Sequence, residues 1–203
     1  MPGSNARALE KAATLPADGL ILDLEDAVAP DAKELARKQV CEAVKARRFG
    51  KREVIIRVNG LDTAWGRDDM ADACAAGPDA ILVPKIETAK DVAAASQLMA
   101  PAQASCALWL MIETPRSIFN ALEIACSGGR LSCFVMGTND LVKEMRAQHT
   151  PGREGLLMAL NAAVMAGRAG KLSVIDGVYN DIANSAGFVA MCEQGRAMGF
   201  DGK

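Results

Sequence analysis

Short apolar runs alternate with longer segments of mixed polarity along the whole chain. The runs carry branched and aromatic side chains, which is typical of strands buried on both faces. The pattern predicts strands at Gly19–Leu24, Glu53–Val58, Ala80–Pro84, Ala107–Ile112, Ser132–Met136 and Leu172–Val178. It predicts helices near Asn5–Leu15, Asp31–Arg47, Gly66–Ala76, Ala89–Met99, Arg116–Cys126, Gly155–Ala169 and Ser185–Met198.

Regular alternation of apolar strands and amphipathic helices predicts an α/β fold with a parallel sheet covered by helices. Polar side chains follow nearly every predicted strand. They are Asp23, Glu25 and Asp26; Arg57 and Asn59; Lys85 and Glu87; Glu113; Asn139 and Asp140; and Tyr179, Asn180 and Asp181. A barrel brings the carboxyl ends of all strands to one mouth, whereas an open sheet concentrates its site at a switch point. Polar residues at so many strand ends therefore favour a (βα)8 TIM barrel.

Six strands are fewer than the eight of a closed barrel. We therefore expect a single TIM-barrel domain over 1–203 in which the first and last strands are largely missing. Met1 would be the end of the first strand, and Gly199–Lys203 would be the turn that enters the eighth. The natural protein is expected to be longer at both ends.

Composition narrows the class of protein. The chain has 203 residues, half of them apolar, which is enough for one substantial core. A net charge of -2 provides no basic field for nucleic acid or an acidic membrane surface. No apolar run approaches the roughly 20 residues of a membrane helix, and the N-terminus does not resemble a signal peptide. The expected location is the cytoplasm.

The six cysteines include no C-x-x-C pair and lie in predicted helices and strands. They are interpreted as small core residues in a reducing compartment, not as a zinc site or a disulfide framework. The single histidine, His149, lies in a polar loop and is interpreted as solvated.

A carboxylate follows each of two neighbouring predicted strands. Glu113 ends one apolar strand, and Asp140 follows the next. Such a carboxylate is costly unless it is paired, hydrogen-bonded or bound to a metal. Mg²⁺ typically takes one or two protein carboxylates and leaves its other positions to water and substrate oxygens. The pair therefore predicts an open Mg²⁺ site that binds a 2-keto or 2-hydroxy acid.

Arg57 is predicted to supply a positive fork for a substrate carboxylate or a developing enolate. The alternative is that Arg57 and Glu113 form a buried ion pair that closes the mouth of the barrel. The backbone N–H groups of Gly137–Asp140 suit a substrate carboxylate, so Gly137 and Asn139 are candidate substrate contacts. A plain turn between strand and helix is the alternative for Asn139.

Charged residues near the N-terminus allow two interpretations each. Asp23, Glu25 and Asp26 could orient metal-bound water or cap the following helix. Arg7 and Lys11 stand one turn apart near a helix N-terminus, which suits a phosphate dock and equally suits a solvated basic face.

Seven stretches, in this order along the chain, resemble the citrate lyase β-subunit-like branch of the HpcH/HpaI aldolase/citrate lyase family. They are Pro2–Ser4, Ile21–Val28, Arg57–Asn59, Leu82–Glu87, Met111–Pro115, Gly137–Leu141 and Gly199–Lys203.

The resemblance implies a TIM barrel that binds Mg²⁺ and cleaves or forms a carbon–carbon bond in a 3-hydroxyacyl-CoA. Malyl-, citramalyl- and citryl-CoA are the substrates it suggests, with a 2-keto acid and an acyl-CoA as products. It implies Glu113 and Asp140 as metal ligands, and Arg57 with Glu113 as the catalytic and substrate-binding groups. Arg7 and Lys11 would contact the phosphates of CoA, which is part of the substrate. The family also implies a homo-oligomer, commonly a trimer.

Two departures from the wider family leave alternatives open. Its pyruvate aldolases carry a histidine just after the second strand, where this chain has Glu25 and Asp26. In several relatives, a C-terminal segment supplies an aspartate to a neighbouring subunit, and no residue follows Lys203 here. The alternatives to a lyase are a malyl-CoA-type thioesterase and a non-catalytic acyl-CoA-binding subunit of a larger lyase assembly.

Overall fold

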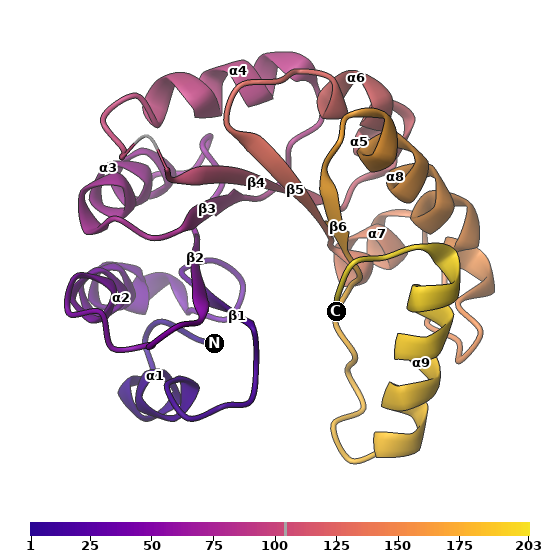
Figure 1. Cartoon of the computed structure of the whole chain (residues 1–203), viewed down its shortest axis with the longest axis horizontal. Helices are drawn as coiled ribbons and strands as arrows, with labels where there is room; N and C mark the ends of the chain where they lie inside the picture. The colour runs from indigo at the N-terminus through magenta and orange to yellow at the C-terminus, as the bar shows by residue number, and fades with distance from the viewer. Residues whose placement is uncertain (104) are drawn as a thin grey trace. The chain divides into compact units, whose positions relative to one another are not determined.

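A computed structural model describes residues 1–103 and 105–203. The strands are β1 (Gly19–Asp23), β2 (Glu53–Arg57), β3 (Ala80–Val83), β4 (Ala107–Ile112), β5 (Leu131–Met136) and β6 (Ser173–Ile175). The α-helices are α1 (Ala6–Ala12), α2 (Lys33–Lys45), α3 (Gly66–Ala76), α4 (Ala89–Leu98), α5 (Pro115–Phe119), α6 (Ala121–Ala125), α7 (Thr138–Glu144), α8 (Leu157–Ala169) and α9 (Ser185–Met198). Two 3-10 turns, η1 (Pro30–Ala32) and η2 (Glu154–Leu156), precede α2 and α8. Figure 1 shows this order along the chain.

The described residues form two compact units. The first comprises Met1–Pro84 and Ala94–Leu108, and the second comprises Lys85–Ala93 and Trp109–Lys203. Each unit has its own apolar core, with Leu22, Ile56 and Ile81 fully buried in the first. In the second, Phe134 and Ile112 are fully buried.

The first unit aligns the carboxyl ends of β1 and β2. These strands pair in parallel, with Gly19 opposite Glu53 and Asp23 opposite Arg57. β2 and β3 are also parallel. Met1–Gly3 adds a short parallel bridge to the end of β1, where the Gly3 N–H donates to the Asp23 carbonyl at 2.8 Å. Because the strands are parallel, the polar residues at their carboxyl ends lie at one edge of this sheet.

The second unit repeats the arrangement. β5 and β6 are parallel, and the Gly137 N–H donates to the Ile112 carbonyl at the end of β4. Gly202 forms a short parallel bridge with Ile175 of β6. Helices α5, α6 and α8 pack against one another on one side of this unit (Figure 1).

The predicted α/β class and all six strand positions are confirmed. The last strand is shorter than predicted: it covers Ser173–Ile175, and Asp176, which follows it, pairs with Arg153. The closed barrel with missing strands, and the single domain, stay predictions.

Two helix predictions were wrong. Arg116–Cys126 was predicted as one helix, but it is interrupted at Asn120, whose amide donates to the Glu87 carbonyl at 2.9 Å. The prediction also missed α7, which begins directly after Gly137. A proline at the first position and a Thr114–Ser117 capping box fix the start of α5.

The interpretation of the cysteines as core residues holds for four of them, whereas Cys126 is exposed and Cys192 is half-buried. Four of the six cysteines are buried, and no disulfide links the described residues. His149 is exposed in the loop that precedes η2. Within 1–103 and 105–203, every helix is too short or too polar to cross a bilayer.

Candidate functional site

In the first unit, Arg57 lies within a cluster of carboxylates at the ends of β1 and β2. Its Nε and Nη2 donate to the two Asp23 oxygens at 2.6 and 2.5 Å. Its Nη1 lies 3.0 Å from Glu25 Oε2 and 3.7 Å from Asp26 Oδ2. The Arg57, Asp23 and Glu25 side chains are nearly buried, whereas Asp26 is 61% exposed. One guanidinium thus faces three carboxylates, and the cluster has an excess of negative charge.

Asp23 is the anchor of this cluster. Its carboxylate accepts hydrogen bonds from the backbone N–H groups of Glu25 and Ala27, in addition to Arg57. Burial alone would raise the pKa of Asp23, but Arg57 and these N–H donors lower it below its ordinary value. The bidentate geometry fixes the guanidinium in one plane.

The sequence analysis missed the support beneath this cluster. The buried Lys33 ammonium donates to the carbonyls of Leu24 and Glu25 and to Asn59 Oδ1, at 2.7 to 2.9 Å. Asn59 in turn donates to the buried Asp69 at 2.6 Å. Burial lowers the pKa of Lys33 and raises that of Asp69. The signal was available, since Lys33 shares the apolar face of α2 at helical spacing with buried residues such as Val40.

In the second unit, Glu113 follows β4 directly and is 1% exposed. Its Oε1 accepts the backbone N–H of Lys85 at 2.8 Å. Gly137 packs against it so closely that a Cβ there would lie 2.4 Å from Glu113 Oε2. The Gly137 N–H donates to the Ile112 carbonyl. Because Gly137 has no side chain, it leaves space for the Glu113 carboxylate. A substrate contact by Gly137 stays a prediction.

Asp140 lies in the first turn of α7. Its Oδ2 is 3.4 Å from the Lys85 ammonium, and the side chains are 24% and 49% exposed. The neighbouring Asn139 exchanges amide hydrogen bonds with Asn180, the closer at 2.8 Å. Lys85 therefore contacts both predicted metal ligands, Glu113 through its backbone and Asp140 through its ammonium.

The donor chemistry of Glu113 and Asp140 fits a hard divalent cation. Both are oxygen ligands, one of them is buried, and a monovalent ammonium already lies against the other. Within the described ranges, no three His, Cys, Asp or Glu side chains gather as a metal cluster. Two carboxylates nonetheless suffice for Mg²⁺, which keeps water or substrate at its remaining positions.

A second buried charge cluster, also missed, follows β6. Arg153 Nη1 donates to both Asp176 oxygens at 2.7 and 2.8 Å, and Lys203 Nζ lies 3.3 Å from the same carboxylate. Burial lowers the pKa of Lys203, although Asp176 opposes the shift. The sequence pattern predicted Asp176 inside the last strand, so the residue was not recognised as part of a charge cluster. The cluster joins the segment before η2 to the end of the chain.

Arg7 and Lys11, the predicted phosphate contacts, are exposed on α1. The Asn5 side chain caps this helix by accepting the Ala8 N–H at 3.1 Å. Their role stays a prediction.

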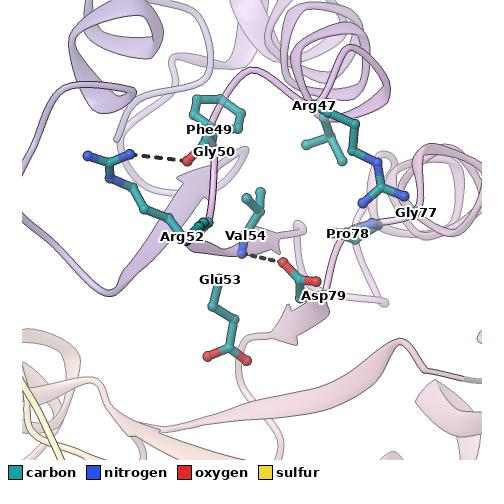
Figure 2. Close-up of a pocket in the computed structure, with 11 residues that line it drawn as sticks. Arg47, Phe49, Gly50, Arg52, Glu53, Val54, Gly77, Pro78 and Asp79 are labelled. Carbon is teal, nitrogen blue, oxygen red and sulfur yellow. Dashed lines mark hydrogen bonds between the residues drawn. The ribbon is translucent and has the colours of Figure 1, made fainter.

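Two of the cavities among the described residues are lined by side chains other than Arg57, Glu113 and Asp140. One, of about 420 Å³, lies at the amino ends of β2 and β3, and Figure 2 shows Asp79 bonded to the Val54 N–H in its wall. Arg57 is at the opposite end of β2. The other, of about 540 Å³, is lined by polar residues that follow β3 and begin α5, including Glu87 and Arg116.

Comparison with known proteins covers the whole chain. The family model described as HpcH/HpaI aldolase/citrate lyase matches residues 1–203. A (3S)-malyl-CoA thioesterase of Cereibacter sphaeroides (strain ATCC 17025) is 47% identical over 203 residues, which are 100% of this chain and 70% of that protein. The citrate lyase subunit beta of Escherichia coli K12 is 34% identical over 210 residues, with the same coverage.

Solved structures agree with these matches. The citrate lyase beta subunit of Mycobacterium tuberculosis, solved with oxaloacetate and magnesium, superposes with a TM-score of 0.83 at 25% identity. The match covers 99% of this chain and 86% of that one. RipC of Yersinia pestis gives a TM-score of 0.82 at 28% identity, covering 94% and 84%.

Proposed function

The chain belongs to the HpcH/HpaI aldolase/citrate lyase family, and from this premise we propose that it hydrolyses the thioester of a 3-hydroxyacyl-CoA of the malyl-CoA type. The carrying observation is the 47% identity to a (3S)-malyl-CoA thioesterase across all 203 residues. This proposal places the thioesterase, an alternative in the sequence analysis, ahead of the lyase.

Glu113 and Asp140 are the proposed Mg²⁺ ligands. The magnesium present in the structure of the M. tuberculosis relative supports this assignment. A bound Mg²⁺ would supply Lewis-acid polarisation of the substrate oxygens. Glu113 is fixed for such a role by the Lys85 N–H and by Gly137, whereas Asp140 lies in a partly exposed ion pair. The buried ligand would set the position, and the exposed ligand would adapt to it.

Thioester hydrolysis adds a water oxygen to the acyl carbon and breaks the C–S bond. The products are the hydroxy acid and the CoA thiol, which takes up one proton. The chain must therefore accept a proton from water, and we assign this role to Asp26, the exposed carboxylate beside Arg57. Arg57 remains the proposed contact for the oxygen that gains charge. Its pairing with Asp23 keeps that guanidinium fixed.

Carbon–carbon cleavage to a 2-keto acid and an acyl-CoA is the second candidate. The 34% identity to a citrate lyase beta subunit favours it. An acyl-CoA-binding role within a larger lyase assembly is the third. For all three, we propose that Arg7 and Lys11 contact the CoA phosphates, that Gly137 and Asn139 contact the acid portion, and that the protein is a cytoplasmic homo-oligomer.

One assay separates the three candidates. The protein is incubated with malyl-CoA, citramalyl-CoA and citryl-CoA, with Mg²⁺ or with EDTA, and free thiol and keto acid are followed together. Free CoA with intact hydroxy acid is the expected result. Keto acid with acetyl-CoA would establish the lyase instead, and the absence of both products would contradict both enzyme assignments.

The metal assignment has its own test. Glu113→Gln keeps the shape of the side chain and removes its charge, so Mn²⁺ binding followed by electron paramagnetic resonance should fall at least tenfold. Glu123→Gln, an equal change of charge on α6, is the control and should leave binding unchanged. Equal Mn²⁺ binding by Glu113→Gln and the wild type would contradict the assignment.

A further inference from the structure

Lys85 contacts both proposed metal ligands from a single position in the chain. Its backbone N–H donates to Glu113 Oε1 at 2.8 Å, and its ammonium lies 3.4 Å from Asp140 Oδ2. Lys85, Glu113 and Asp140 all belong to the second unit.

The backbone of Lys85 is itself unusual. Its φ of 54° lies in the left-handed region, which residues other than glycine rarely adopt. The same residue donates its backbone N–H to the Glu113 carboxylate. Residues held in such a conformation persist where surrounding contacts fix them, often at functional sites. Here the bond to Glu113 and the ion pair to Asp140 are two such contacts.

We propose that Lys85 is a positioning residue of the metal site with two separate actions. Its N–H orients Glu113, and its ammonium lies against Oδ2 of Asp140 until a divalent cation replaces it. The inference rests on the proposed metal site and adds that the Lys85 ammonium competes with the divalent cation for Asp140. The ion pair suits such an exchange, because Lys85 and Asp140 are both partly exposed and such a pair is weak.

Replacement of the Lys85 ammonium by a divalent cation should set the order in which metal and substrate bind. A cation that binds Asp140 displaces the Lys85 ammonium, whose long side chain then presents a positive charge beside the bound cation. An anionic acid group would meet that charge only after the metal has bound. Metal and anionic substrate should therefore bind with positive coupling, and Lys85 should carry part of that coupling.

The test measures metal affinity directly. Lys85→Met keeps the N–H and the length of the side chain but removes the charge, so the Kd for Mn²⁺ without substrate should fall about three- to tenfold. Lys85→Gly removes the same charge, and glycine is the residue that best tolerates a positive φ. It should therefore give the same shift in the Kd for Mn²⁺. Lys85→Arg restores a cation and should return the Kd toward that of the wild type.

Lys90→Met is the matched control, since it removes one positive charge from the first turn of α4 in the same unit. It should leave the Kd for Mn²⁺ within a factor of two of the wild-type value. The second readout is coupling: malate should tighten Mn²⁺ binding in the wild type, and it should do so less in Lys85→Met.

The outcomes distinguish this inference from the metal site itself. If Glu113→Gln abolishes Mn²⁺ binding but Lys85→Met leaves it unchanged or weakens it, the metal site stands and the competitor role is wrong. If the wild type binds no Mn²⁺, both fail. A tighter Kd in Lys85→Met and Lys85→Gly, with loss of coupling to malate, supports the proposal.

Discussion

Arg57 in the first unit and Lys85 in the second are both cations beside carboxylates that follow strands, but their surroundings differ. Arg57 is nearly buried, and three of its nitrogens face Asp23 and Glu25 at 3.0 Å or less. Lys85 is half exposed, and its ammonium lies 3.4 Å from Asp140. The first arrangement is fixed by several short bonds, whereas the second can be exchanged for another cation at little cost.

This difference suits the two clusters to different tasks. A fixed guanidinium supplies charge in a set place, which is how preorganised groups stabilise developing charge. An exchangeable ammonium neutralises a carboxylate and still leaves it available to another cation. The following changes test whether burial and bond geometry separate the two clusters as described.

The largest effect is expected from Asp23→Ala. It leaves the Arg57 guanidinium buried without its bidentate partner and removes the acceptor for the Glu25 and Ala27 N–H groups. We expect a loss of about 3–5 kcal/mol in the free energy of unfolding, measured by urea titration. Asp26→Ala, which removes the exposed member of the same cluster, should cost less than about 1 kcal/mol. Equal losses in both variants would contradict the distinction.

Acid should remove the Asp23 contribution. The pKa of Asp23 is lowered from its ordinary value of 3.8, so its stabilisation is complete above that value and is lost as pH falls through the folded-state pKa. The difference in unfolding free energy between wild type and Asp23→Ala should therefore be constant near neutral pH and shrink below about pH 4. A difference that grows on acidification would show that Asp23 acts through something other than its charge.

Lys33→Met should have the next largest effect. It leaves the Leu24 and Glu25 carbonyls and Asn59 Oδ1 without the ammonium that they share. The Leu24 carbonyl keeps the Asn59 amide and the Glu25 carbonyl keeps the Val28 N–H, so Asn59 Oδ1 is the acceptor that loses its donor. An unsatisfied buried acceptor costs about 1–3 kcal/mol, so a loss in that range is expected by urea titration. Lys38→Met, at an exposed position of α2, is the control and should change stability by less than about 0.5 kcal/mol.

These buried clusters also mark the limit of prediction from the sequence. Strand positions and the carboxylates Glu113 and Asp140 could be predicted, because apolar runs and the residues that end them are local features. The hydrogen bonds that polar side chains form with distant parts of the chain could not be predicted. Lys33 and Asn120 bind backbone carbonyls of residues many positions away, and no local pattern encodes such bonds.

Asp176 shows the same limit in another form. Its neighbours in sequence are apolar, so the residue was assigned to the strand interior. Arg153, which pairs with it, is 23 positions earlier in the chain. Only the fold brings an isolated aspartate and a distant arginine together in the core, so the pairing has no sequence signal.

Gly137→Ala tests the fixed part of the second cluster. The added Cβ would lie 2.4 Å from the Cβ and Oε2 of Glu113 and 2.9 Å from Met111 Cε, so Glu113 must shift. We expect a loss of about 1–3 kcal/mol in stability and weaker Mn²⁺ binding. Gly155→Ala, whose nearest neighbour would be 3.6 Å away, should change neither. Normal Mn²⁺ affinity in Gly137→Ala would show that the position of Glu113 is not critical.

Asp140→Asn should give the smallest change in stability and is the sharpest comparison with Asp23. Its ion-pair partner among the described residues is a half-exposed ammonium at 3.4 Å, so the free energy of unfolding should fall by less than about 1 kcal/mol. Mn²⁺ binding should nevertheless fall at least tenfold, because a carboxylate ligand is lost. Urea titration could instead show a loss of unfolding free energy as large as that of Asp23→Ala. The ion pair to Lys85 would then stabilise the fold, and a divalent cation could replace the ammonium only at a large cost in free energy.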